Sequence, residues 1–160
     1  MSKTALYPGT FDPITNGHID LVNRTLTIFD TVIIAVAPSL KKVPLFTTEE
    51  RINLINRAVK DIRGARIEAF ESLLVDYAFK RKSVAIIRGL RVVSDFEYEL
   101  QMALMNRRLN ANIETVFMMP SQEYTFLSST LVKEVASFGG PVKGLVPGVV
   151  ERALKKKFKK

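Results

Sequence analysis

Short apolar runs alternate along the chain with segments whose apolar residues are spaced as on one face of a helix. Several runs are almost continuously apolar, which is typical of strands buried on both faces. The predicted strands are TALY (4–7), TVIIAVA (31–37), RIEAF (66–70), SVAIIR (83–88) and ETVFMM (114–119). The helical stripes are Ile19, Val22, Leu26 and Phe29, then Ile52, Ile55 and Val59, then Phe96, Leu100 and Leu104. The alternation predicts an α/β fold, a parallel sheet with helices on both faces.

Local signals mark where several helices begin. Thr47 with Glu50, and Ser94 with Glu97, have the spacing of a capping box. Pro147 suits the first turn of a last, basic helix over 147–160. The glycine-rich segment 138–148 is interpreted as a connector to that helix, with a mobile flap as the alternative.

Length and composition restrict the class of protein. The chain has 160 residues, 47% of them hydrophobic and 25% charged, as expected for one folded domain over 1–160. No apolar run approaches the ~20 residues of a membrane span, and the first residues do not resemble a secretion leader. With no cysteine, disulfides and thiolate catalysis are excluded. We expect a cytoplasmic protein that does not bind a membrane.

The positive charge of the chain is concentrated at its end. The net charge is +8, but the last six residues hold five lysines, and 8 − 5 leaves +3 for the rest. A surplus of this size suits a small polyanionic ligand and does not require nucleic acid. We interpret the tail as a solvated helix end, whose lysines face the negative pole of the helix dipole.

The only histidine of the chain stands just after the first strand, in YPGTFDPITNGH (7–18). Thr10 follows that strand, and His18 lies at the start of the next helix. Free backbone N–H groups and the helix dipole bind anions there, and they disfavour imidazolium until a phosphate is bound. A purely structural role for His18 in the first helical turn is the alternative. The chain has neither a dinucleotide-binding G-x-G-x-x-G nor a Walker A sequence.

Cationic side chains follow two further strands. Lys41 and Lys42 come after the second strand, and Arg88 and Arg91 flank Gly89 after the fourth. Two arginines around a glycine can clamp a phosphate, because guanidinium binds its oxygens in a bidentate manner. Taken singly, the lysine pair is best explained as a solvated turn, and the arginine pair is equally well explained as a turn glycine with two surface arginines.

Three consecutive hydroxyl residues, Ser128, Ser129 and Thr130, precede the helical segment after the fifth strand. One N-cap needs only one hydroxyl, and Lys133 follows where an acid would suit the dipole better. A bound anion would reconcile both choices, although capping alone remains an alternative. Because these groups follow four strands of one parallel sheet, we expect them to converge on a phosphate-rich ligand site.

The motifs YPGTFDPITNGH, FTTEER, IRGLR, DFEYE and SSTLVKEV occur in an order and spacing that resemble the bacterial phosphopantetheine adenylyltransferase family of nucleotidyltransferases. The resemblance implies a Rossmann-like, five-stranded sheet of order 3-2-1-4-5 and a homohexamer. It also implies transfer of the adenylyl group of ATP to 4′-phosphopantetheine, which gives dephospho-CoA and pyrophosphate, with Mg²⁺ as cofactor. The sequence has no separate metal motif, so protein ligands of the metal are unknown.

The resemblance also implies roles for individual residues. Thr10 would orient the attacking phosphate, and His18 would stabilise charge at the α-phosphorus. The residues on the phosphopantetheine side would be Thr10, Lys42, Leu74 and Arg88. The ATP contacts would be Thr10, Phe11, His18, Gly89, Leu90, Arg91, Glu99, Tyr124, Thr125, Phe126, Leu127, Ser128, Ser129 and Thr130. Some members of the family have tryptophan where this chain has Tyr124, which affects only packing on the adenine side.

Three other functions are compatible with parts of the sequence. The first is a related nucleotidyltransferase that uses CTP or another phosphorylated acceptor, which the pocket around Leu73, Leu74 and Tyr124 would decide. The second is a nucleic-acid-binding module built on the basic tail, although the chain lacks an RNP-like aromatic platform. The third is a nucleotide sensor without activity, which the presence of Thr10, His18, Lys42 and Arg88 argues against.

Overall fold

A computed structural model describes residues 2–38, 43–91 and 93–159, with only the backbone of 93–95. The strands are β1 (Thr4–Gly9), β2 (Thr31–Val36), β3 (Ala65–Ala69), β4 (Ala85–Gly89) and β5 (Glu114–Met118). The helices are α1 (Asn16–Thr25), α2 (Thr48–Ala58), α3 (Leu74–Lys80), α4 (Val93–Leu109), α5 (Ser129–Ser137) and α6 (Gly148–Phe158), with a short 3₁₀ helix η1 (Gln122–Tyr124). All five strands lie within two residues of their predicted bounds.

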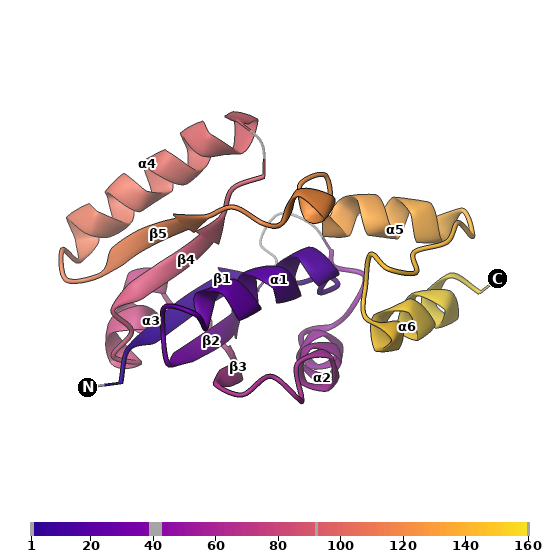
Figure 1. Ribbon diagram of the computed structural model, residues 1–160, viewed down its shortest axis with the longest axis horizontal. Helices are drawn as coiled ribbons and strands as arrows, with labels where there is room; N and C mark the ends of the chain where they lie inside the picture. Colours follow the sequence, from indigo (N-terminus) through magenta and orange to yellow (C-terminus); the bar gives the residue numbers. More distant parts are fainter. Residues whose placement is uncertain (1, 39–42, 92, 160) are drawn as a thin grey trace.

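The five strands form one parallel sheet in the order β3-β2-β1-β4-β5 (Figure 1). The first three strands are added in one direction, and β4 and β5 are added on the other side of β1. The strand order therefore reverses between β1 and β4, and in open α/β sheets the crevice beyond the carboxyl ends of such strands is the usual ligand site. The order confirms the expected fold class.

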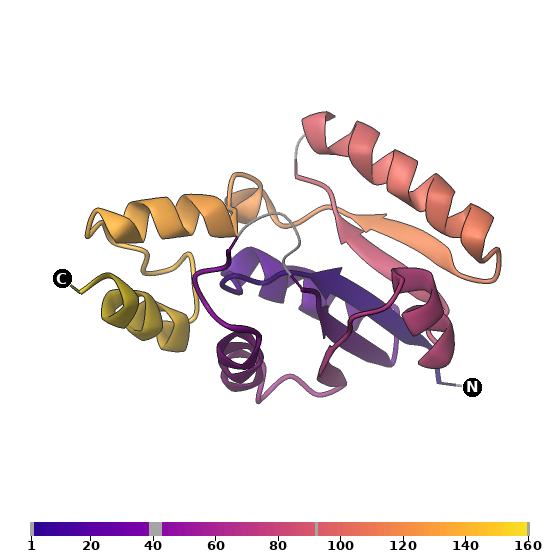
Figure 2. The ribbon, with the colours of Figure 1, turned by 180° about the vertical axis from the view of Figure 1, so that it is seen from behind.

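Side chains alternate between the two faces of the sheet, and each face has its own core. On one face Tyr7, Ile34 and Ile87 pack in the larger cluster, with apolar residues of α1, α2, α5 and α6. On the other face Leu6 and Ile33 pack with residues of α3, which lies across the sheet in Figure 2. Helices thus cover both faces, as the continuously apolar strands predict.

The predicted helix starts were partly correct. Thr47 and Glu50 form the expected capping box of α2. The prediction for Ser94 was wrong: α4 begins at Val93, so Ser94 is already its second residue. Pro147 is the N-cap of α6 and precedes its first turn. The sequence analysis missed α3, whose seven residues are too few for a recognisable stripe and whose N-cap Leu73 makes no side-chain capping bond.

Two further features concern the surface and the C-terminal region. Within the described ranges, no helix is both long enough and apolar enough to span a bilayer. The segment before α6 is packed on the body of the protein: Val142 and Val146 are buried, and the backbone N–H of Asn16 donates to Leu145 O over 2.9 Å. These contacts hold that segment against the start of α1.

Candidate active site

The loop that follows β1 is folded back on the sheet around an aromatic ring. Phe11 is 3% exposed and has a φ of 49°, and its ring packs edge-on against Tyr7 and against His18, with centroids 5.4 and 5.1 Å apart. A Cβ on Gly9 would lie 2.9 Å from this ring, so only glycine leaves room for it. The turn leaves Thr10 exposed beside the crevice, as the sequence suggested.

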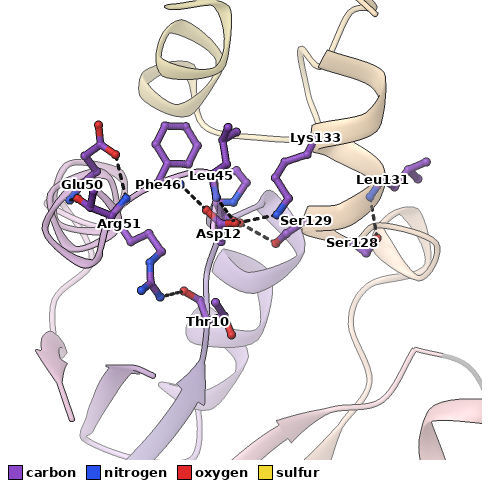
Figure 3. A network of polar contacts seen from close by, with 12 residues as sticks. Thr10, Asp12, Leu45, Phe46, Glu50, Arg51, Ser128, Ser129, Leu131 and Lys133 are labelled. Carbon is purple, nitrogen blue, oxygen red and sulfur yellow. Dashed lines mark hydrogen bonds and ion pairs between the residues drawn. The ribbon is translucent and has the colours of Figure 1, made fainter. Parts of the chain in front are cut away.

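Asp12 joins this loop to two other segments. Its carboxylate accepts the backbone N–H groups of Leu45 and Phe46, both at 2.9 Å, and Nζ of Lys133 at 2.7 Å (Figure 3). Burial alone would raise the pKa of Asp12, but the bonds from Lys133 and the two N–H groups outweigh it and hold the pKa below its usual value. The sequence analysis had proposed a bound anion as the partner of Lys133. In the structure the carboxylate of Asp12 is that partner.

His18 closes the start of α1. Thr15 is the N-cap, and its backbone N–H donates to Nδ1 of His18 over 3.0 Å. Because Nδ1 accepts, the proton of the neutral ring lies on Nε2, which remains a hydrogen-bond donor. Burial, and secondarily the charge of Arg91, lower the pKa of His18 to about 4. The capping role considered as an alternative is real, and it leaves a neutral donor at the other side of the ring.

Arg88 and Glu99 lie side by side at the end of β4. Nε and Nη2 of Arg88 donate to the two carboxylate oxygens of Glu99 over 2.7 and 2.6 Å. Burial opposes the charge of Arg88, but the bonds to Glu99 prevail and raise its pKa. Sequence similarity had given these residues to different substrates, whereas the structure joins them in one bidentate pair.

The start of α5 uses its hydroxyl residues for different tasks. Ser128 caps the helix by accepting the N–H of Leu131 over 3.1 Å, and Ser129 Oγ donates to Pro13 O over 2.7 Å. Arg91 approaches from the β4 side, with Nη1 donating to Leu127 O over 3.1 Å. The first turn of α5 is thereby tied to both neighbouring strand ends.

A cavity of about 430 Å³ opens between these segments. It is lined by Thr10, Phe11, Asp12, Val43, Pro44, Arg91, Ser128, Ser129, Thr130 and Lys133. The cavity thus brings together Thr10 after β1, Arg91 after β4 and Ser128–Thr130 after β5, whereas His18 and Arg88 are not among the residues that line it. Lys42 lies outside the described residues, and Leu74 begins α3, where it packs against the second core.

A second set of contacts ties α1 to the segment around η1. Asp20 accepts the backbone N–H and the hydroxyl of Ser121, both at 2.8 Å, and Nε of Arg24 at 3.0 Å. A Cβ on Gly17 would lie 3.4 Å from Cβ of Tyr124, so the helix start and this tyrosine are close neighbours. Leu127 is buried, whereas Phe126 is 59% exposed. Tyr124 therefore lies beside the start of α1, and of residues 124–130 only Ser128, Ser129 and Thr130 line the cavity.

The sequence analysis missed two residues that organise this site, Asp12 and Arg51. Both lie inside motifs that had been singled out, TFDP and TTEER, yet polar residues in such turns are usually solvated. Arg51 is 1% exposed, and its Nη1 donates to Thr10 O over 2.6 Å. A buried partner across 41 residues leaves no local signal in the sequence.

A parallel α/β sheet with cationic and hydroxyl groups beyond its switch point is typical of proteins that bind nucleotides, and comparison with known proteins identifies the class as nucleotidyltransferases. The family model described as "Cytidylyltransferase-like" matches residues 6–135. A solved structure from Vibrio parahaemolyticus, described as a candidate nicotinate-nucleotide adenylyltransferase, has the same fold, with a TM-score of 0.73 over 99% of this chain and 95% of that one at 18% identity.

More similar relatives identify the branch of the family. Phosphopantetheine adenylyltransferase of Thermodesulfovibrio yellowstonii is 60% identical over 100% of both chains. Those of Moorella thermoacetica and Geobacter sulfurreducens are 52% and 54% identical, over 98% of this chain and 98% and 96% of theirs. The chain belongs to the cytidylyltransferase-like family and, within it, to the phosphopantetheine adenylyltransferases, the nucleotidyltransferases of coenzyme A biosynthesis.

Proposed function

We propose that this protein transfers the adenylyl group of ATP directly to the phosphate of 4′-phosphopantetheine. A non-bridging oxygen of the acceptor phosphate attacks the α-phosphorus of ATP in line. The bond from that phosphorus to the oxygen bridging the α- and β-phosphates breaks, and its electron pair leaves with pyrophosphate. The products are dephospho-CoA and pyrophosphate, without a covalent enzyme intermediate. The observation that carries the proposal is the cavity lined by Thr10, Arg91 and Ser128–Thr130 at the switch point of the sheet.

In this mechanism the chain orients two anions and stabilises charge. Thr10 positions the acceptor phosphate, and Nε2–H of neutral His18 donates to an oxygen on the α-phosphorus as negative charge develops. An acceptor phosphate is already an anion at neutral pH, so the reaction needs no strong general base. A His18 pKa of about 4 is compatible with this donor role, because the ring stays neutral until a phosphate is bound.

The two substrates use different parts of the crevice. We assign the phosphopantetheine side to Thr10, Lys42, Leu74 and Arg88. We assign ATP to Thr10, Phe11, His18, Gly89, Leu90, Arg91 and the residues from Tyr124 to Thr130. Glu99, which the resemblance gives to ATP, acts in this proposal by orienting Arg88. The backbone N–H groups at the start of α5 and the guanidinium of Arg91 suit the triphosphate.

Nucleotidyltransferases of this family generally use a divalent metal ion, and we propose Mg²⁺. Within the described part of the chain, no three His, Cys, Asp or Glu side chains gather as a metal site, and both oxygens of Asp12 already accept hydrogen bonds. These residues fit a metal ion that is carried by the phosphates of ATP and by water. When bound, Mg²⁺ would supply charge neutralisation on the triphosphate.

We further propose a single cytoplasmic domain over residues 1–160 that assembles as a homohexamer. Helix α4 lies along one edge of the sheet (Figure 1), and large apolar side chains are exposed along much of its length. Its exposed apolar residues are Phe96, Tyr98, Leu100, Met102, Leu104, Met105 and Leu109. A surface of this kind favours burial against another copy of the chain. Sedimentation velocity of the purified protein tests the assembly.

One assay tests the proposed reaction: pyrophosphate release with ATP and phosphopantetheine as the only substrates. We expect release that requires both compounds and yields dephospho-CoA. Release that requires CTP, or that ignores phosphopantetheine, would assign the chain to another reaction of the superfamily. Salt-dependent nucleic-acid binding that is lost on deletion of residues 155–160, without nucleotide turnover, would favour a binding module instead.

A further inference from the structure

The buried side chain of Arg51 links the chain just after β1 to the chain just after β2. It lies in the first turns of α2 and is 1% exposed. Its Nη1 donates to Thr10 O over 2.6 Å (Figure 3). The same Nη1 donates to Ala37 O over 2.9 Å, and Nη2 donates to Thr48 Oγ1 over 2.9 Å. One guanidinium therefore contacts the chain just beyond β1, just beyond β2, and its own helix.

The two carbonyl groups need such a donor because the sheet ends there. Ala37 N–H donates to Gly9 O over 2.9 Å, which is the last rung between the chains that leave β1 and β2. The carbonyls of Thr10 and Ala37 lie past that rung, and a buried carbonyl without a partner is costly. A planar guanidinium can serve both at once, whereas an ammonium group has no such fixed fork.

A buried cation is a costly donor for these two carbonyl groups. The hydrogen-bond acceptors of Arg51 among the described residues are neutral oxygens, and its Nε is buried without a hydrogen-bond partner among them. Burial lowers the pKa of Arg51, and the charge of Asp12 offsets only part of that effect. An apolar side chain would avoid the desolvation cost of the charge but would leave the carbonyls of Thr10 and Ala37 without this donor. Residues that break a local rule in this way are expected where function requires them.

We propose that Arg51 is a positioning residue for adenylyl transfer, which holds Thr10 at a fixed place relative to the end of β2. The inference rests on the proposed function. Arg51 is too deeply buried to contact a substrate, so it acts through the main chain of Thr10, whose exposed side chain lines the cavity. Catalysis by alignment is sensitive to such support, since a displacement of about 1 Å can lower a rate about 100-fold.

The position of Arg51 predicts which substrate is affected. It lies on the β1–β2 side of the crevice, whereas most proposed ATP contacts come from the end of β4 and from residues 124–130. Loss of Arg51 should therefore impair use of phosphopantetheine and the chemical step, and leave the affinity for ATP nearly unchanged. If Arg51 only maintained the fold, its loss would lower activity with both substrates equally, in proportion to the loss of folded protein.

The test compares Arg51→Met and Arg51→Lys with Arg57→Met, an exposed arginine of the same helix. Rates are measured well below each melting temperature and corrected for the folded fraction, and ATP binding is measured by equilibrium dialysis. We expect kcat/KM for phosphopantetheine to fall about 100-fold in Arg51→Met, to recover partly in Arg51→Lys, and to stay normal in Arg57→Met. The ATP Kd should change less than about twofold in all three. An equal loss for both substrates, or a normal rate in Arg51→Met, would overturn the proposal.

Residue-resolved amide hydrogen exchange tests the same link without an activity assay. Both Arg51 variants should speed exchange of the Ala37 amide, while the amide of Val32, bonded to Gly64 O at the opposite end of β2, stays unchanged. If Arg51→Met does not fold, Arg51→Lys alone decides. Unchanged exchange at Ala37 would refute the structural link. If the wild-type chain lacks phosphopantetheine-dependent turnover, the proposed function fails, and this measurement still decides whether Arg51 orders the strand ends.

Discussion

The backbone N–H of Thr15 donates to Nδ1 of His18 over 3.0 Å, so the helix start uses one nitrogen of the imidazole and leaves the proton of the neutral ring on the other. The capping bond sets the orientation of the ring and leaves the proton of the neutral form on Nε2. The structural and catalytic interpretations of His18 are therefore compatible, because each uses a different nitrogen.

His18→Asn should separate these two functions. The asparagine oxygen can replace Nδ1 as the acceptor for Thr15, but the side chain is too short to supply the Nε2 donor. We expect kcat to fall about 100-fold or more, as for loss of one oxyanion donor, while α1 remains folded and the ATP Kd changes little. Steady-state kinetics and equilibrium binding measure both quantities. Normal turnover would show that His18 has no part in charge stabilisation.

The ionisation of His18 can be followed directly, because the chain has one histidine and therefore one set of imidazole ring signals. In the ligand-free protein, NMR titration should give a pKa near 4, since burial and Arg91 disfavour imidazolium. Addition of ATP should raise that pKa, because a bound phosphate favours the charged form. A free-protein value near the ordinary 6.5 would contradict the burial of the ring.

The lowered pKa of His18 also predicts how stability depends on pH. The unfolded chain binds the imidazole proton more tightly, so this contribution is fully present above about pH 6.5 and is lost as pH falls toward 4. The full loss is on the order of 3 kcal/mol. Urea unfolding of the wild type and His18→Asn at pH 7 and pH 4.5 isolates the effect: the wild type should lose more stability than the variant over this interval. Equal losses would contradict the shift.

Loss of Lys133 should destabilise the fold by leaving Asp12 without its cation. The side chain of Asp12 is 6% exposed and that of Lys133 is 29% exposed, so the pair is poorly screened by water. We expect Lys133→Met to lower the free energy of unfolding by about 1–3 kcal/mol in urea titrations. Lys155→Met removes a pair with Glu151 in which the lysine is 70% exposed, and it should lower the free energy of unfolding much less. Equal effects would refute a special role for Asp12.

Glu99→Gln tests whether this residue serves ATP or orients Arg88. The bidentate contact predicts that loss of the charge lets the guanidinium move, which raises KM for phosphopantetheine several-fold with little change in KM for ATP. A direct nucleotide contact predicts the reverse pattern. Glu97→Gln, an exposed acid of the same helix, is the matched control and should alter neither constant.

Local patterns predicted much of the sheet and of the site, for reasons that particular residues make plain. Runs such as TVIIAVA can be buried on both faces only in a covered parallel sheet, and the observed β2 spans six of these seven residues. Thr10, Arg91 and Ser128–Thr130 could be grouped before the structure was known, because parallel strands end at one edge. The start of α4 was misplaced because residues that suit a capping box also occur within a first helical turn.

The sequence by itself determined the class of fold, the order of the five strands along the chain and the polar groups that follow them, because periodicity and turn chemistry act over a few residues. Only the tertiary structure decided how these groups are used. Lys133 is neutralised by Asp12 across 121 positions, Arg88 is oriented by Glu99, and Arg51 reaches the carbonyl of Thr10 from another helix. Such pairs depend on burial and on how helices pack against the sheet, and a stretch of a few residues predicts neither.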